Sequence, residues 1–339
     1  MKYHLLGKTG LKVSELCMGT MTFGGKGYFK PIGSLGQEAV DALMKRAING
    51  GINFIDTANV YSEGLSEELT GKSIRNLGLH RDDLVLATKV RGKMGDGPND
   101  SGLTRKHILQ QAEASLRRLQ VDYIDLYQIH SYDPLTPLEE TLSALDDLVR
   151  SGKVRYIGAS NLAAWQLMKA LAFSDYHRIA RFESLQAYYT IAGRDLEREL
   201  LPLLRDQHVG LMVWSPLAGG LLSGKYSRNQ EKDASGRRVN FDFPPVNRVR
   251  AFDIIDELKS MAAEKNATVA GLALAWLLHQ PAVTTVIIGA NKMEQLEENL
   301  KSVDLTFRAE ELDKLNKLSQ LPAEYPGWML ERTGGDRKI

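Results

Sequence analysis

The stretch "GINFIDTANVYSEG", residues 51–64, changes from mostly apolar to mostly polar at Asp56. Its first half has the Ile and Phe content of a buried strand, and its second half has the polar residues of a loop. A helical pattern follows near 65–77. The stretch therefore predicts a strand, a loop and a helix, with a carboxylate at the strand end and the phenol of Tyr61 on the loop.

The same strand-then-helix unit recurs eight times along the chain. The strand patterns lie at 14–21, 52–58, 84–90, 123–130, 154–160, 183–189, 210–217 and 284–290. The helical patterns that follow them lie near 36–49, 65–77, 104–119, 137–151, 162–172, 195–206, 249–264 with 268–279, and 292–301. Consecutive units of this kind predict parallel strands that are buried on both faces.

Eight units in about 300 residues predict an α/β fold, a closed (β/α)8 TIM barrel in a single domain. The alternative is a doubly wound open sheet. No G-x-G-x-x-G motif follows the first strand pattern, however, so the dinucleotide fingerprint of such sheets is absent. We assign residues 1–320 to the barrel. Residues 321–339 form a tail that either folds back over the barrel mouth or stays mobile.

Two long irregular stretches, 24–36 and 217–247, each follow a strand pattern and would lie on the carboxyl-terminal rim of the barrel. Long loops at this rim often act as lids or contact ligands. A tolerated surface insertion is the alternative for each loop.

The composition limits the classes of partner. The 339 residues are 43% hydrophobic and 25% charged with a formal net charge of +1, which does not favour nucleic acid or an anionic membrane as a general partner. No apolar run approaches the roughly 18 residues of a membrane span, and charges at Lys8, Lys12 and Glu15 interrupt any signal-peptide core. The single cysteine, Cys17, is expected to be a buried structural thiol in a reducing compartment. We expect a cytoplasmic protein without a metal site, and the sequence leaves open whether it is a monomer or a homo-oligomer.

A barrel carries its chemistry at the carboxyl-terminal ends of its strands. Each such residue has an ordinary structural explanation when it is taken alone, such as a turn-capping Asp, a Lys that reaches solvent or a hydrogen-bonded His. Together on one rim they favour a functional site. The strand ends carry Thr20, Asp56, Lys89, His130, Ser160–Asn161, Gln186, Trp214–Ser215 and Gly289–Ala290.

The residue types suggest a proton donor. A free tyrosine titrates near 10, and a lysine ammonium beside Tyr61 would lower that pKa. A drop of about two units corresponds to roughly 2.7 kcal/mol. Asp56 would keep Lys89 charged, and His130 would hydrogen bond to the same substrate oxygen. None of these side chains can deliver hydride, so a reduction requires a cofactor.

At these residues the sequence resembles the aldo-keto reductase superfamily over nearly its whole length. The resemblance rests on "GINFIDTANVYSEGLSEELTGKSI", "LVLATKV", "DYIDLYQIHSYD" and "GKVRYIGASN", and it is nearest to bacterial reductases and potassium-channel β subunits. It implies a (β/α)8 barrel that binds NADPH without a Rossmann domain, with NADH as the less expected cofactor. The catalytic tetrad of the family falls on Asp56, Tyr61, Lys89 and His130.

The resemblance also implies the cofactor contacts. Ser160, Asn161 and Gln186 match contacts to the nicotinamide carboxamide, and Trp214 matches the aromatic that stacks on the nicotinamide ring. The segment "WSPL" and Lys225 resemble the pyrophosphate site. The implied residues on the nicotinamide and pyrophosphate side are Gly19, Thr20, Met21, Asp56, Ser160, Asn161, Gln186, Trp214, Ser215, Pro216, Leu217 and Lys225.

At the other end of the cofactor the resemblance implies contacts in "GANKMEQLEENL" and one in the second long loop. The amides that open the last helix favour a phosphate. Many relatives have an arginine there, whereas this chain has Asn291 and Lys292, and a lysine point charge would discriminate less against NADH. The implied residues are Arg238, Gly289, Asn291, Lys292, Gln295, Glu298 and Asn299.

The leading hypothesis is an NADPH-dependent reductase of an aldehyde, ketone or sugar-like small molecule, in which Tyr61 protonates the oxygen. In reverse it would act as an alcohol dehydrogenase. One alternative is a lyase that uses Lys89 as a Schiff-base nucleophile, although Asp56 would keep that lysine protonated. The other is a non-enzymatic cofactor-binding module like the channel β subunits.

Overall fold

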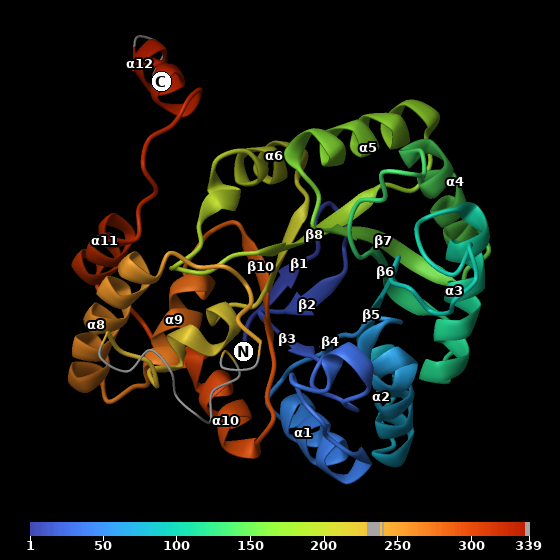
Figure 1. Cartoon of the computed structure of the whole chain (residues 1–339), viewed down its shortest axis with the longest axis horizontal. Coiled ribbons are helices and arrows are strands. Elements are labelled where there is room, and N and C mark those ends of the chain that lie inside the picture. The colour runs from blue at the N-terminus through green and yellow to red at the C-terminus, as the bar shows by residue number, and fades with distance from the viewer. Residues whose placement is uncertain (229–237, 239–240, 336–339) are drawn as a thin grey trace.

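In a computed structural model, which describes residues 1–228, 238 and 241–335, eight parallel strands form a closed barrel (Figure 1). Around the barrel the order is β10-β3-β4-β5-β6-β7-β8-β9, and β10 closes the ring by pairing with both β3 and β9. The predicted (β/α)8 barrel is confirmed, and the open-sheet alternative is wrong. The strands are β3 (Leu16–Gly19), β4 (Phe54–Asp56), β5 (Val85–Val90), β6 (Ile124–Ile129), β7 (Val154–Ser160), β8 (Phe182–Tyr188), β9 (Gly210–Trp214) and β10 (Val283–Ile288).

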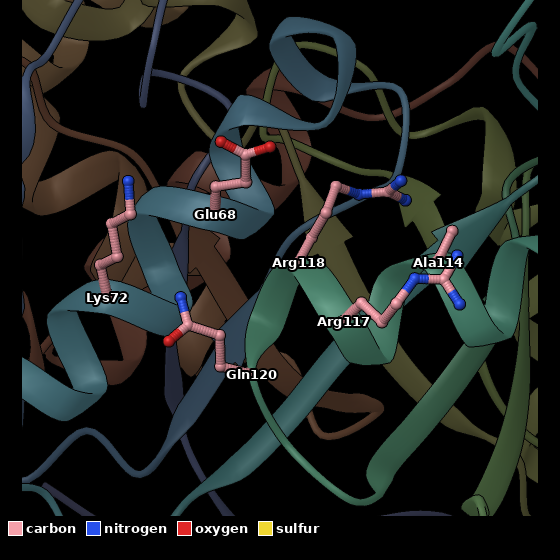
Figure 2. Close-up of a pocket in the computed structure, with 6 residues that line it drawn as sticks. All are labelled: Glu68, Lys72, Ala114, Arg117, Arg118 and Gln120. Atoms are coloured by element: carbon pink, nitrogen blue, oxygen red, sulfur yellow. The ribbon is translucent and has the colours of Figure 1, made fainter.

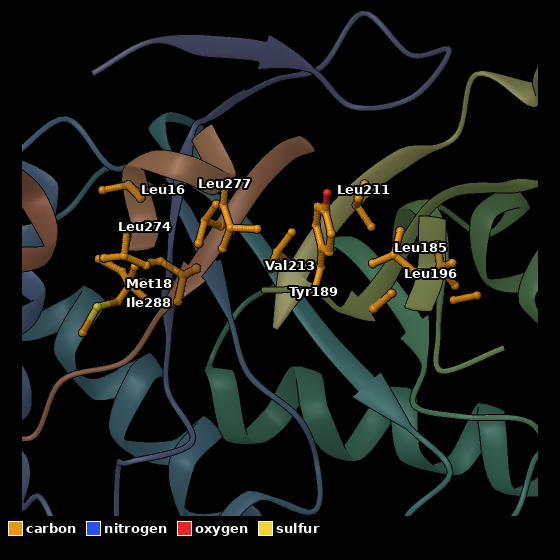
Figure 3. Packing of buried hydrophobic residues seen from close by; sticks show 14 of the residues in the cluster. Leu16, Met18, Leu185, Tyr189, Leu196, Leu211, Val213, Leu274, Leu277 and Ile288 are labelled. Atoms are coloured by element: carbon orange, nitrogen blue, oxygen red, sulfur yellow. The ribbon is translucent and has the colours of Figure 1, made fainter. Parts of the chain in front are cut away.

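Helices surround the barrel and bury the outward faces of its strands. In Figure 3, Leu274 and Leu277 of one such helix, α9, lie with Leu16 and Met18 of β3 and Ile288 of β10 in one core. The helices are α1 (Gln37–Asn49), α2 (Leu65–Asn76), α3 (Arg105–Leu119), α4 (Leu138–Arg150), α5 (Ala164–His177), α6 (Leu200–Gln207), α8 (Arg248–Lys265), α9 (Val269–Leu278), α10 (Met293–Lys301), α11 (Ala309–Leu318) and α12 (Gly327–Thr333). Burial on both faces explains why the strands are continuous apolar runs.

A two-stranded antiparallel hairpin, β1 (Tyr3–Leu5) with β2 (Lys12–Ser14), precedes the barrel. This hairpin was not predicted from the sequence. Leu6 and Val13 are fully buried in one cluster with Cys17 and Phe54 of the barrel strands. The hairpin therefore closes the amino-terminal end of the barrel and leaves the carboxyl-terminal end for the site. Cys17 is buried, and burial, followed by the Asp56 charge, raises the pKa of its thiol well above the usual value.

The helix predicted at 195–206 is wrong in its first half. A short 3-10 turn, η4 (Asp195–Glu197), is followed by α6, which begins only at Leu200. Pro202 explains the break, because proline lacks an N–H and clashes with the preceding turn unless it lies in the first turn of a helix. The helix therefore begins two residues before the proline.

Both long rim loops contain short 3-10 turns, η1 (Gly27–Phe29) in 24–36 and η5 (Ala218–Ser223) in 217–247. Residues 229–237 and 239–240 of the second loop, and 336–339 of the tail, lie outside the described residues. In Figure 1 α12 stands away from the barrel at the end of an extended segment, and none of its residues is buried. Closure of the tail over the mouth therefore stays a prediction. No helix within the described part of the chain is long and apolar enough to cross a membrane.

Candidate active site

The ends of β4 and β5 bring three of the predicted residues together. Lys89 lies inside the barrel, fully buried, and its Nζ donates to Oδ2 of Asp56 at 2.5 Å and to the carbonyl of Thr57 at 2.9 Å. The same Nζ is 3.2 Å from the phenolic oxygen of Tyr61, which lies in the 3-10 turn η2 (Tyr61–Gly64) after β4. Adjacent strand ends in a parallel barrel therefore place a carboxylate, an ammonium and a phenol in contact.

Two glutamines hold the other oxygen of Asp56. The Nε2 atoms of Gln128 on β6 and Gln186 on β8 each donate to Oδ1 at 2.9 Å. Gln186 was predicted as a nicotinamide contact, and the structure places its amide on the carboxylate. Gln128 is not among the residues predicted from the sequence. The signal was a polar residue two positions before His130 in an apolar strand, because positions i and i+2 point to the same face of a strand.

His130 follows β6, and its ring lies beside Tyr61 with the two ring centroids 5.7 Å apart. Burial, together with the positive charges of Lys89 and Arg91, lowers the pKa of His130 to about 3. The imidazole is therefore neutral at neutral pH. A neutral imidazole keeps one N–H with which it can donate to an oxygen near Tyr61.

The lysine is charged, as predicted, but the pKa of the tyrosine shifts in the opposite direction to the prediction. Burial is the largest influence on the Lys89 pKa and lowers it, but attraction to Asp56 and Tyr61 outweighs burial, and the pKa is raised. For Tyr61, burial raises the pKa more than the Lys89 charge lowers it. The predicted fall in the Tyr61 pKa is therefore wrong in net direction, since the phenol is only 8% exposed. The lysine acts in the predicted sense, but desolvation is stronger.

The ends of β7 and β9 bring together further predicted residues. Nδ2 of Asn161 donates to the His130 carbonyl and to Oγ of Ser160, both at 3.0 Å. Oδ1 of Asn161 accepts from Nε1 of Trp214 at 3.0 Å, and Oγ of Ser160 donates to the Gln186 carbonyl at 2.9 Å. These groups form one connected polar cluster beside the indole ring.

The predicted residues of the first strand end lie next to Asp56 and Tyr61. Gly19 pairs with Asp56 in the parallel register, and the backbone N–H of Thr20 donates to the Asp56 carbonyl at 3.0 Å. Met21 packs against a small apolar group that includes Tyr61 and Phe29. This segment therefore packs against the part of the mouth that holds Asp56 and Tyr61.

The loop after β9 has an open backbone at Gly220, and the N–H groups of Ala218, Gly219 and Gly220 donate to acceptors within the loop itself. Oγ of Ser215 accepts from the backbone N–H of Gly219 at 3.0 Å. Gly220 has φ +94°, and no described atom lies within 4 Å of the position that a Cβ would take there. A phosphate can approach such a backbone closely. Pro216 is buried, Leu217 is partly buried, and Lys225 is exposed.

Arg238 does not point to solvent. Its guanidinium donates to the carbonyls of Ala218 at 2.6 Å and Pro244 at 2.8 Å, and pairs with Asp242 at 2.6 Å. The residue is 7% exposed. In this conformation Arg238 links the start of the second rim loop, at Ala218, to its end, at Asp242 and Pro244. A contact between Arg238 and a 2′-phosphate stays a proposal.

The turn before α10 is similarly open. No described atom lies within 4 Å of the position that a Cβ would take at Gly289. Nδ2 of Asn299 donates to the Gly289 carbonyl at 3.3 Å, Oε1 of Gln295 accepts from the Asn291 N–H at 2.8 Å, and Nδ2 of Asn291 donates to the Ile32 carbonyl at 3.1 Å. Lys292 and Glu298 are exposed. The chemistry of these two open backbones, with a nearby lysine, fits the phosphates of a dinucleotide.

A continuous row of aromatic rings, here called the aromatic rim, joins the two long loops across the mouth. Neighbouring ring centroids are 5.1–5.8 Å apart. The aromatic rim consists of His130, Tyr61, Phe29, Tyr28, Phe241, Phe243, Trp214 and Tyr188. It gives the mouth an apolar lining and accounts for the burial of Tyr61.

A separate hollow of about 320 Å³ lies between α2 and α3 in the helical layer (Figure 2). None of the predicted site residues lines it, and its Arg118 is committed to the buried Glu67, whose carboxylate accepts from Nε at 2.6 Å. Its lining is Glu68, Lys72, Ala114, Arg117, Arg118 and Gln120. We therefore place the candidate active site at the barrel mouth.

Known proteins resemble this chain over nearly its whole length. The family model described as "Aldo/keto reductase family" matches residues 15–320. An uncharacterized oxidoreductase, YrpG, of Bacillus subtilis is 40% identical over 326 residues, which are 94% of this chain and 96% of that protein. A probable voltage-gated potassium channel subunit beta of Arabidopsis thaliana is 36% identical, over 96% of this chain and 99% of that protein. A putative aryl-alcohol dehydrogenase of Schizosaccharomyces pombe is 37% identical, over 93% of this chain and 95% of that protein. The chain belongs to the aldo/keto reductase family.

Proposed function

We propose that the chain reduces the carbonyl group of a small aldehyde or ketone, with NADPH preferred over NADH and with Tyr61 as the general acid. The observation that carries this proposal is the contact of 3.2 Å between the Tyr61 phenol and the Lys89 ammonium, which Asp56 holds. The chemistry suits a proton donor at the mouth of a barrel. The oxidoreductase and dehydrogenase named among the relatives support the same class of reaction.

A bound NADPH would supply the hydride, which no side chain can provide. As the carbonyl carbon gains that hydride, the carbonyl oxygen takes the phenolic proton of Tyr61, so the product is an alcohol. Lys89 stabilises the phenolate that remains, and Asp56 keeps the lysine protonated. The neutral His130 donates a hydrogen bond to the same oxygen and orients the substrate.

Separate groups of residues are proposed to hold the nicotinamide carboxamide, the bridging phosphates and the 2′-phosphate of the dinucleotide. Asn161 and Ser160, beside Trp214, donate their own hydrogens to protein groups, so their side-chain oxygens would accept hydrogen bonds from the carboxamide NH2. The backbones at Gly220 and Gly289 are open to phosphate oxygens. Lys292, exposed at the start of α10, supplies a charge for the 2′-phosphate of NADPH.

Tyr61→Phe tests the proposal, because it removes the proton and little else. We expect kcat for NADPH oxidation with a good aldehyde to fall at least about 100-fold. The dissociation constant of NADPH, measured by quenching of protein fluorescence, should stay within about twofold of wild type, since the lost hydroxyl faces the substrate. An unchanged rate would remove Tyr61 as the acid.

A non-catalytic cofactor-binding role is the second candidate, and the likeness to a potassium channel β subunit favours it. Such a module would copurify with its dinucleotide and turn over negligibly against a panel of aldehydes, ketones and sugars. A Schiff-base lyase is disfavoured because the raised pKa of Lys89 keeps it protonated. Borohydride trapping of a carbonyl compound on Lys89 would revive it.

A further inference from the structure

The turn that presents Tyr61 has an unusual backbone. Ser62, Glu63 and Gly64 follow the tyrosine with φ values of 50°, 58° and 92°. The left-handed region is disfavoured for residues with a Cβ, and such residues persist there only where their surroundings hold them. Two successive non-glycine residues in this region therefore require an external restraint.

The hydroxyl of Ser62 provides that restraint. Ser62 is completely buried, and its Oγ donates to the carbonyl of Phe23 at 3.0 Å and accepts from the N–H of Gly25 at 2.8 Å. These two backbone groups lie on either side of Gly24 in the first rim loop. One hydroxyl thus ties the tyrosine turn to that loop at two points.

The two segments also interlock sterically. A Cβ at Gly24, whose φ is +95°, would lie 2.9 Å from the Ser62 Cβ, and a Cβ at Gly27 would lie 2.6 Å from Oε1 of Glu63. From the same rim loop, the ring of Phe29 packs against Tyr61 with centroids 5.3 Å apart. The turn therefore has little room to relax while the hydroxyl bonds are made.

The position of the phenol depends on this turn. The Lys89 ammonium is already fixed by Asp56 and by the Thr57 carbonyl, so the tyrosine must be brought to the lysine. We propose that Ser62 is a positioning residue, whose hydroxyl locks the left-handed turn onto the first rim loop and so holds the Tyr61 phenol against Lys89. This inference rests on the proposed role of Tyr61 as the general acid.

Ser62→Ala removes both hydrogen bonds and leaves the left-handed backbone in place. We expect kcat for carbonyl reduction to fall by about 10- to 100-fold, because small displacements of a reacting group are costly. The dissociation constant of NADPH should not change. Hydrogen exchange in peptides covering 22–36 and 57–66 should become faster. Ser184→Ala is the matched control, since Ser184 is also fully buried and its hydroxyl has no hydrogen-bond partner among the described residues.

Ser62→Gly separates positioning from general stability. Glycine accepts the left-handed backbone, so the thermal midpoint of Ser62→Gly should exceed that of Ser62→Ala, while kcat stays low. Recovery of kcat together with stability would overturn the inference, as would a wild-type kcat in Ser62→Ala. If wild type itself reduces no carbonyl compound, the proposed function fails. Hydrogen exchange still tests whether the Ser62 hydroxyl restrains the turn, because an unchanged exchange rate at 57–66 in Ser62→Ala would refute that restraint.

Discussion

Nζ of Lys89 lies 2.5 Å from Oδ2 of Asp56, and the two side chains are only 0% and 3% exposed. Burying both charges is costly, and their mutual attraction offsets this cost only when the remaining polar atoms are also satisfied. Here the Thr57 carbonyl accepts a hydrogen bond from the lysine, and the amides of Gln128 and Gln186 donate to the second carboxylate oxygen. The pair is therefore stable as a unit, and either residue without its partner would destabilise the folded protein as an uncompensated buried charge.

Lys89→Met should lower the free energy of unfolding by about 3–5 kcal/mol, because it leaves the Asp56 carboxylate buried without its partner. The double variant Lys89→Met with Asp56→Asn should recover part of that loss, since no charge then remains inside. Urea unfolding of the two single variants and the double variant measures this coupling. Strictly additive losses would show that the two side chains do not interact energetically.

The barrel and the Asp56–Lys89–Tyr61 contact could both be predicted from the sequence for one reason. In a parallel barrel the strand order along the chain decides which strand ends are neighbours, so consecutive apolar runs ending in polar residues specify a shared site. Gln128 gave a weaker signal because it carries no charge. Its importance comes from the buried oxygen that it satisfies, which only the structure reveals.

The electrostatic state of Tyr61 could not be predicted from neighbouring charges. It depends on how deeply the phenol is buried, and part of that burial comes from Phe29 in a loop without a regular pattern. The same holds for Arg238, which the sequence placed in a variable loop. Its fastening of that loop depends on the carbonyls of Ala218 and Pro244, whose directions the sequence does not specify.

The depressed pKa of His130 has a consequence for stability against pH. Its folded pKa is about 3, and an unfolded histidine titrates near 6.5. Between these values the unfolded chain binds a proton that the folded protein does not. The free energy of unfolding should therefore fall as the pH falls from 6.5 towards 3, by at most about 1.4 kcal/mol per pH unit for this group.

His130→Gln should flatten that part of the stability profile relative to wild type, as measured by urea unfolding at several pH values. His4→Gln, at an exposed position of β1, is the control and should leave the profile as it is. In wild type, kcat for reduction should also show no inflection near pH 6.5, because His130 stays neutral there. An inflection at that pH that disappears in His130→Gln would contradict the neutral ring.

Asn291 and Lys292 are adjacent in sequence but should affect different steps. Asn291 donates to the carbonyl of Ile32 in the first rim loop, whereas the exposed Lys292 faces solvent at the start of α10. Asn291→Leu keeps roughly the size of the side chain but cannot donate, and it adds no charge beside the proposed phosphate site. It should therefore raise the KM for the carbonyl substrate, because the loop beside Tyr61 loosens, and should change the NADPH dissociation constant little.

Lys292→Ala should have the opposite pattern of effects. It should raise the dissociation constant of NADPH severalfold and leave the carbonyl KM unchanged. The affinity for NADH should not change, because NADH lacks the 2′-phosphate. Titrating both dinucleotides against both variants by fluorescence quenching separates the two roles. A loss of NADPH affinity in Asn291→Leu with an unchanged carbonyl KM would instead assign Asn291 to the cofactor.

The raised pKa of Tyr61 predicts the alkaline limit of carbonyl reduction. The phenol must be protonated to act as the acid, so activity is lost as the pH rises through its pKa. Burial holds that pKa above the ordinary value near 10. The kcat of wild type should accordingly stay level to about pH 10 and fall only above it.

Phe29→Ala should move this alkaline limit to lower pH. It removes the ring that packs against Tyr61, so desolvation weakens while the attraction to Lys89 remains. Tyr28→Ala is the matched control, since Tyr28 is 68% exposed and its ring contacts Phe29 and Phe241. The alkaline limit is measured from profiles of kcat between pH 7 and 11 for wild type and both variants. An equal shift in both variants would mean that the whole aromatic rim, and not Phe29 alone, sets the acidity of the phenol.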